Sequence, residues 1–230
     1  MPPDASVLVV DDHALFSEAV ALALATAGRS VHRLCLETAG RTPARLLAAA
    51  LRIRPDIALL DLDLGRYGDG QDLIRPLTRS GVAVIVVTGH ADEADWGGCL
   101  RHGARVVFSK HRPLSELIRL VRSLEADEQV LDPGEYQRLT SLWQERQVED
   151  DEHRRRLARL TPREREVLGE LMAGHTIREI AGQDVVSEAT VRTQVRTILH
   201  KLGVSTQIAA VGLAHRVAWH APPTGRAVKT

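Results

Sequence analysis

The stretch DIALLDLDLG, residues 56–65, sets an apolar run directly beside acidic side chains. The run from Ile57 to Leu60 has the continuous apolar character of a strand that is covered on both faces of a parallel sheet. Asp61 and Asp63 follow at the point where that strand would end. Because an ionised carboxylate is costly to bury without compensation, these acids belong either to a surface turn or to a site.

Strand-like runs of this kind recur through the first half of the chain. They lie at residues 7–10, 31–36, 82–87 and 106–108, in addition to 57–60. Helix-like segments separate them at 14–27, 43–55, 71–79, 92–102 and 113–126. This alternation predicts an α/β domain with a doubly wound, five-stranded parallel sheet. In such a sheet, ligands bind at the carboxyl ends of the strands, near the point where the strand order reverses.

The composition fits a globular protein with two domains. The chain has 230 residues, of which 44% are hydrophobic and 26% charged. Its net charge of zero hides an acidic excess of five in residues 1–150 and a basic excess of five in 151–230. The basic part makes nucleic acid a candidate partner. Because neither a signal peptide nor a membrane span is visible, we expect a cytoplasmic location and no membrane partner.

Chemically active side chains follow successive predicted strands. Asp11 and Asp12 end the first strand, Asp61 the third, Thr88 the fourth and Lys110 the fifth. If the first and third strands are neighbours, three carboxylates meet at one edge, and their repulsion requires a cation or raised pKa values. Such an oxygen-only site suits Mg²⁺. Asp61 could then attack as a nucleophile in phosphoryl transfer while Mg²⁺ and Lys110 neutralise charge.

The segments VLVVDDH, LLDLDLG, VVTGH and VFSK together resemble the receiver domain of two-component response regulators, over residues 6 to about 125. The resemblance implies a flavodoxin-like fold, with Asp61 as the phospho-acceptor and a sensor histidine kinase as the phosphoryl donor. It implies a Mg²⁺ site formed by Asp11, Asp12, Asp61 and the backbone carbonyl of Asp63. It also implies that the groups in contact with the phosphoryl group are Thr88 and Lys110.

Val107 departs from the pattern of that family. Its members usually have Tyr, Phe or His three positions before the lysine, and this side chain swings inward when the threonine is drawn to the phosphoryl group. One alternative is therefore a receiver that works without phosphorylation. A second alternative is an enzyme, because DLD at 61–63 also resembles the nucleophile motif of haloacid-dehalogenase-like phosphatases.

The middle of the chain changes in character. Asp132-Pro133-Gly134 marks a break, after which charge blocks appear at 149–152 and 154–156. Leu139 and Trp143 recur there at helical spacing, which fits either a solvated helix or a contact between subunits. We therefore predict a linker, helical in part.

The basic half reads as a series of short helices. Thr161, Pro162 and Glu164 have the spacing of an N-cap, a first helical residue and a capping box. A second helix fits 177–182, and Ser187 can cap a third. One face of this third helix is apolar, and the other carries Arg and Thr side chains of the kind that contact bases in the DNA major groove.

The run LTPREREVLGELMAGHTIREIAG, with VVSEATVRTQVRTILHKLGVST and AAVGLA after it, resembles the LuxR-type helix-turn-helix over roughly residues 158–216. The resemblance implies that three side chains read bases: Arg192, Thr193 and Arg196. It places three others nearer the phosphates: Thr190, His200 and Lys201. In the family the closing helix, here about 205–216, pairs two subunits. Asp184 stands where the family usually has an apolar residue, so we expect a loosened turn or an exposed side chain.

These features predict a DNA-binding transcriptional response regulator of the NarL/FixJ type, and not an enzyme. Its partners would be double-stranded DNA, a sensor histidine kinase and a second copy of the chain, at least on DNA. Four parts are expected: a receiver domain at 1–126, a helical linker at 127–157, a helix-turn-helix domain at 158–220 and a disordered tail at 221–230.

Overall fold

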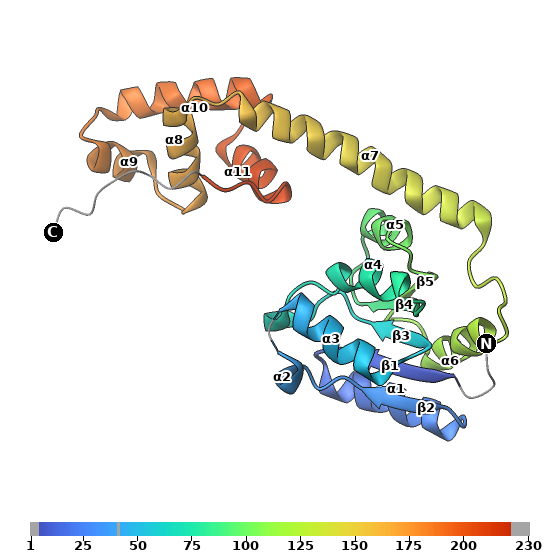
Figure 1. The fold of residues 1–230 in the computed structure, drawn as a ribbon. Coiled ribbons are helices and arrows are strands. Elements are labelled where there is room, and N and C mark those ends of the chain that lie inside the picture. Colours follow the sequence, from blue (N-terminus) through green and yellow to red (C-terminus); the bar gives the residue numbers. More distant parts are fainter. Residues whose placement is uncertain (1–4, 41, 222–230) are drawn as a thin grey trace. The chain divides into compact units, whose positions relative to one another are not determined.

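The computed structural model describes residues 5–40 and 42–221, and it falls into two compact units, Met1–Gln144 and Glu145–Thr230 (Figure 1). Of the predicted tail, residues 222–230 lie outside the described residues. Within the described part of the chain, every helix is too short or too polar to cross a bilayer.

The first unit is built on one parallel sheet of five strands, as the sequence predicted. The strands are β1 Ser6–Val10, β2 Ser30–Arg33, β3 Ile57–Leu60, β4 Ala83–Thr88 and β5 Val106–Ser109. Their order is β2-β1-β3-β4-β5, and all neighbouring pairs are parallel. The chain leaves β1 toward one edge and returns at β3 on its other side, so the strand order reverses between β1 and β3.

Helices cover both faces of this sheet, because alternate strand residues point to opposite sides. Val7 and Val9 pack with α1 Ala14–Thr26 and α6 Leu114–Glu125. Leu8 and Val10 pack on the opposite side, which three helices cover (Figure 1). These are α3 Pro43–Ile53, α4 Gln71–Arg79 and α5 Glu93–Arg101.

The second strand is shorter than predicted. β2 ends at Arg33, and Leu36–Ala39 forms the short helix α2 instead of extending the strand. β2 is an edge strand whose side chains are mostly exposed, whereas Leu34 and Leu36 are buried in the core beside α3. Burial of these two leucines bends the chain away from the sheet edge.

The predicted linker contains one long helix. α7 runs from Pro133 to Ala158 without interruption, beginning in the first unit and ending in the second. Leu139 is buried in the core of the first unit, and Leu157 is buried in the core of the second. Neither a purely solvated helix nor a subunit contact is needed to explain Leu139, because it packs within its own chain.

The second unit contains the predicted short helices, each with a cap. They are α8 Pro162–Met172, α9 Ile177–Asp184, α10 Glu188–Leu202 and α11 Gln207–Arg216. The capping box of Thr161 and Glu164 is confirmed, and Ser187 caps α10. The apolar face of α10 forms the centre of this unit's core through Val191, Val195, Ile198 and Leu202.

The turn between α9 and α10 differs from expectation. Asp184 does not lie exposed: only 7% of its side chain is accessible, and it forms an ion pair with Arg163 of α8, which also pairs with Glu166. The next residue, Val185, has a left-handed backbone with φ of 55° and is 91% exposed. An ion pair therefore anchors a turn that contains an unfavourable backbone conformation for a β-branched residue.

Replacing Val185 by Asn is expected to stabilise the second unit by about 1 kcal/mol. Asn tolerates the left-handed region, which costs other residues about 1–2 kcal/mol. Native-state hydrogen exchange of the α10 amides measures the gain. Val186→Asn is the matched control, because Val186 is not among the described residues with positive φ. Equal protection in both variants would contradict strain at Val185.

Candidate functional site

The carboxyl ends of β1 and β3 bring two buried acids together. Val10 pairs with Leu60 in the sheet, and the Asp61 amide donates to the Val10 carbonyl at 2.9 Å. The next residue along each strand is therefore an aspartate at the same edge. Asp11 is 8% exposed and Asp61 only 2%. Burying two carboxylates side by side requires a compensating positive charge.

Lys110 supplies part of that charge from the end of β5. Its Nζ lies 2.8 Å from Asp11 Oδ2 and 2.6 Å from Asp61 Oδ2. The ammonium also lies 4.8 Å from the centre of the Phe16 ring, a cation–π contact that holds it against α1. One cation thus bridges the two buried carboxylates.

Burial raises the pKa of Asp61 above its ordinary value, and the charge of Asp11 acts in the same direction. The hydrogen bond from Lys110 opposes this shift without cancelling it. Burial alone would lower the pKa of Lys110, but its bonds to Asp11 and Asp61 outweigh burial and raise it. Lys110 therefore stays protonated, while Asp61 retains a stronger hold on its proton than an exposed aspartate does.

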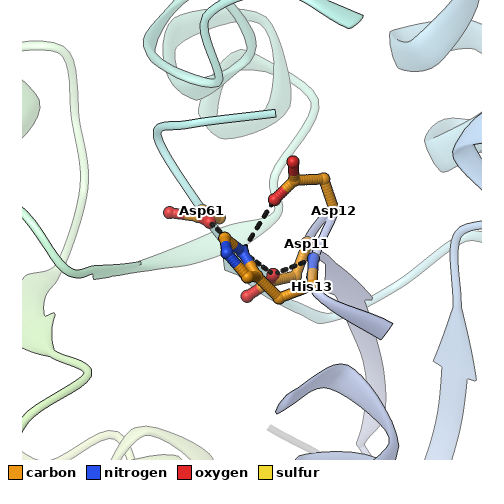
Figure 2. A group of neighbouring side chains, drawn as sticks. All are labelled: Asp11, Asp12, His13 and Asp61. Atoms are coloured by element: carbon orange, nitrogen blue, oxygen red, sulfur yellow. Dashed lines mark hydrogen bonds and ion pairs between the residues drawn. The ribbon is translucent and has the colours of Figure 1, made fainter. Parts of the chain in front are cut away.

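Asp12 and His13 complete the cluster. Figure 2 shows the His13 ring among the carboxylates of Asp11, Asp12 and Asp61. Its Nδ1 lies 2.8 Å from Asp12 Oδ1 and 4.0 Å from Asp61 Oδ2. Each of these four residues has one atom that could bind a metal ion, and these four atoms all lie within 4.8 Å of one another. Three carboxylates at this separation offer oxygen ligands of the kind that Mg²⁺ prefers.

His13 was missed by the sequence reasoning. The only available signal was its position directly after two acids, and neither spacing nor period indicates that its ring folds back over them. Its amide also donates to Asp11 Oδ1 at 2.8 Å, so the turn after β1 fixes both the histidine and the acid.

The loop after β3 turns Asp63 away from the cluster. The Asp63 side chain is exposed and accepts from the Gly65 amide at 2.9 Å. Further along the loop, Gly70 returns so close to Asp61 that a Cβ atom would lie 1.9 Å from the Asp61 carbonyl oxygen. Only glycine permits this approach, which fixes the loop beside Asp61.

Thr88 lies fully buried at the end of β4. Its hydroxyl oxygen accepts from the His90 amide at 3.0 Å, and its carbonyl accepts from the Lys110 amide at 2.8 Å. The sheet therefore brings the strand ends that carry Asp11, Asp61, Thr88 and Lys110 to one edge. The hydroxyl of Thr88 is engaged with the loop that follows it.

The second predicted group of site residues lies on α10. The side chains on its outer face are exposed: Thr190, Arg192, Thr193, Arg196 and His200. Arg192 pairs with Glu188 at 3.0 Å, and the Thr193 hydroxyl donates to the Ala189 carbonyl. This face presents cationic and hydroxyl groups from one side of a helix whose other side is buried.

Lys201 stands apart from that group. Its Nζ lies 2.8 and 2.7 Å from the two carboxylate oxygens of Glu164. Glu164 also accepts from the Thr161 amide, so one carboxylate joins the start of α8 to the end of α10. The structure thus gives Lys201 a role inside the domain, in contrast to the exposed side chains of α10.

Comparison with known proteins matches both units. The model of the response regulator receiver domain matches residues 7–122, and that of the bacterial regulatory proteins of the luxR family matches 158–214. The probable transcriptional regulatory protein NarL of Mycobacterium tuberculosis is 32% identical over 94% of this chain and 95% of its own. The nitrate/nitrite response regulator protein NarP of Escherichia coli is 30% identical over 89% and 91%.

Solved structures show the same fold. RcsB from Salmonella enterica serovar Typhimurium, solved on a promoter, aligns with a TM-score of 0.50 at 22% identity, over 93% of this chain and 100% of that one. The receiver and luxR-family matches exclude the phosphatase alternative. The chain belongs to the response regulators of the NarL type, DNA-binding transcription regulators that join a receiver domain to a LuxR-type helix-turn-helix domain and are not enzymes.

Proposed function

We propose that Asp61 accepts a phosphoryl group from a sensor histidine kinase in the cytoplasm, and that this step controls DNA binding by the second unit. The observation that carries the proposal is the contact of Lys110 with both Asp11 and Asp61 at the carboxyl edge of the sheet. A buried carboxylate beside an ammonium, with further carboxylates within 4.8 Å, is suited to receive a doubly charged group.

In the transfer, an Asp61 carboxylate oxygen forms a bond to phosphorus as the phosphorus–nitrogen bond of phosphohistidine breaks. The bonding electrons stay on the imidazole nitrogen of the kinase, which takes up a proton. Lys110 moves from the carboxylate to the transferred oxygens, and the Thr88 hydroxyl donates to one of them. Mg²⁺ held by Asp11, Asp12, Asp61 and the Asp63 carbonyl would favour ionised Asp61 and neutralise phosphoryl charge.

Incubation with acetyl phosphate and Mg²⁺ is expected to add about 80 Da, the mass of one phosphoryl group, to the wild type. Asp61→Asn should gain nothing, because the amide is not a nucleophile. Asp63→Asn is the matched control and should label like the wild type, since the Asp63 side chain is exposed and bound to Gly65. Intact-protein mass spectrometry gives the result. Equal labelling of the wild type and Asp61→Asn would refute Asp61 as acceptor.

A second candidate function is regulation without phosphorylation. Val107 favours it, because a buried valine occupies the place of the rotating aromatic side chain of relatives. The two candidates differ in one measurement: operator affinity before and after treatment with the phosphodonor. An affinity that is unchanged in a labelled protein would favour the second candidate.

We further propose that α10 enters the DNA major groove, with Arg192, Thr193 and Arg196 reading bases. Thr190 and His200 would contact phosphates. The exposure of this face and the buried opposite face support the assignment. Lys201 would reach a phosphate only after leaving Glu164, so we assign it chiefly to holding α10 against α8. The promoter complex of RcsB, solved with the phosphomimetic BeF₃⁻, adds support from a protein of the same fold.

Arg192→Ala is expected to weaken operator binding by about 1–3 kcal/mol and to relax base preference at one position. The control is Arg155→Ala, which removes an exposed arginine of the same unit from a different helix, α7. Fluorescence anisotropy with operator and scrambled DNA gives both affinities. If Arg192→Ala binds the operator as tightly as Arg155→Ala does, Arg192 does not read a base.

The last helix, α11, supports a homodimer on DNA. Ile208 is 85% exposed and lies on the same helix as the exposed residues Ala209 and Gly212. Covering Ile208 with α11 of a second subunit would remove its apolar surface from water, and the small residues beside it leave space for that helix.

Ile208→Glu is expected to weaken binding to DNA with two half-sites by about tenfold or more, because each subunit loses burial of about 1.5–3 kcal/mol. Binding to a single half-site should stay unchanged. Val148→Glu is the control, since Val148 is 70% exposed on α7. Sedimentation on the two DNA lengths distinguishes one bound subunit from two. A normal dimer with Ile208→Glu would remove α11 from the interface.

A further inference from the structure

The first part of α7 packs unusually closely on α5. Two consecutive glycines, Gly97 and Gly98, face it in the middle of α5. A Cβ atom at Gly97 would lie 2.1 Å from the Leu139 carbonyl oxygen, and one at Gly98 would lie 2.9 Å from the Trp143 ring. A glycine in the middle of a helix costs about 0.5–1 kcal/mol of stability. The two glycines offset this cost by allowing α7 to pack directly against α5.

Polar and aromatic contacts on either side of the two glycines also hold α7 against α5. Arg138 donates two hydrogen bonds of 2.8 Å to the carboxylate of Glu93, at the start of α5. Trp143 packs edge to face against His102, just past the end of α5, with ring centres 6.5 Å apart. Leu139 between them is 3% exposed. The first part of α7 therefore contacts the start of α5, its middle and the residue just after its end.

Two consecutive hydrogen bonds connect Thr88 to α5. The Thr88 hydroxyl accepts from the His90 amide at 3.0 Å, and the His90 carbonyl accepts from Trp96 Nε1 at 3.0 Å. Trp96 directly precedes Gly97. A displacement of the Thr88 hydroxyl therefore bears on the part of α5 that contacts α7.

Val107 lacks the groups that would carry such a displacement by another route. Its side chain has a single rotatable bond and no polar atom, and it is buried in the same core cluster as Leu139. A valine in this position packs in the core but has no group that can respond to a movement of the Thr88 hydroxyl.

We propose that His90 and Trp96 are positioning residues that transmit the state of Thr88 to α7, through two states of the segment 133–144, docked on α5 or released from it. The proposal rests on phosphorylation of Asp61. When Thr88 rotates to donate its hydroxyl proton to the phosphoryl group, its oxygen moves out of reach of the His90 amide. The loop that carries His90 then shifts, and the Trp96 indole N–H loses the His90 carbonyl as its acceptor. The contact of Gly97 and Gly98 with α7 then loosens.

The test compares hydrogen–deuterium exchange of residues 133–144 in the full chain, with and without acetyl phosphate and Mg²⁺. In the wild type, phosphorylation is expected to speed exchange there by about tenfold. Trp96→Phe keeps an aromatic ring, although a smaller one, and removes the N–H donor. It should gain the same mass as the wild type, yet show little difference in exchange between its labelled and unlabelled forms. Trp219→Phe, in the second unit, should behave as the wild type does.

A second variant tests docking without any phosphodonor. Gly97→Ala should speed exchange of 133–144 by about tenfold in the unlabelled protein, because its methyl group collides with the backbone of α7. Gly182→Ala is the control, since Gly182 is also in a helix and a Cβ atom there would meet nothing within 4 Å.

The outcomes are distinguishable. A wild type that labels on Asp61 without faster exchange at 133–144 overturns the proposal and leaves the proposed function standing. A labelled Trp96→Phe that responds like the wild type also overturns it. Unchanged exchange in Gly97→Ala refutes the docked state itself. A wild type that does not label overturns both the proposed function and this inference.

Discussion

The bridge from Lys110 to Asp11 and Asp61 is the constraint on which the first unit depends. Two carboxylates about 5 Å apart repel by about 3 kcal/mol at an effective dielectric constant of about 20, and burial adds a desolvation cost. Because the compensating ammonium comes from β5, the sheet must bring the ends of β1, β3 and β5 to one edge. The strand order thus places Lys110 where its charge offsets the cost of burying Asp11 and Asp61.

Compensating charge also accounts for one departure from the family pattern. At Asp184 an acid stands where the family usually has an apolar residue, and Arg163 supplies the charge that allows it to be buried. At Val107 a buried valine stands where the family usually has Tyr, Phe or His. In this chain, hydrogen bonds through His90 and Trp96 join the loop after β4 to α5.

Sequence reasoning predicted the features that depend on local pattern. Continuous apolar runs gave the strands, the spacing of Thr161 and Glu164 gave a helix start, and acids at strand ends gave the cluster. It failed where distant segments decide the outcome. The end of β2 depends on burial of Leu34 and Leu36, and the position of Leu139 depends on two glycines some forty residues earlier. No window of sequence contains both partners of such contacts.

The 26-residue helix α7 has a consequence for how this protein can change over evolutionary time. In an α-helix, each inserted residue turns everything after it by about 100°. A single residue inserted between Leu139 and Trp143 would therefore turn Trp143 away from the side of α7 that packs on Gly98 and His102. A residue inserted where the two units join would leave Leu139 and Leu157 each with the core of its own unit. The first turns of α7 are consequently restricted in length by the first unit, whereas these contacts place no such restriction on the stretch at the boundary.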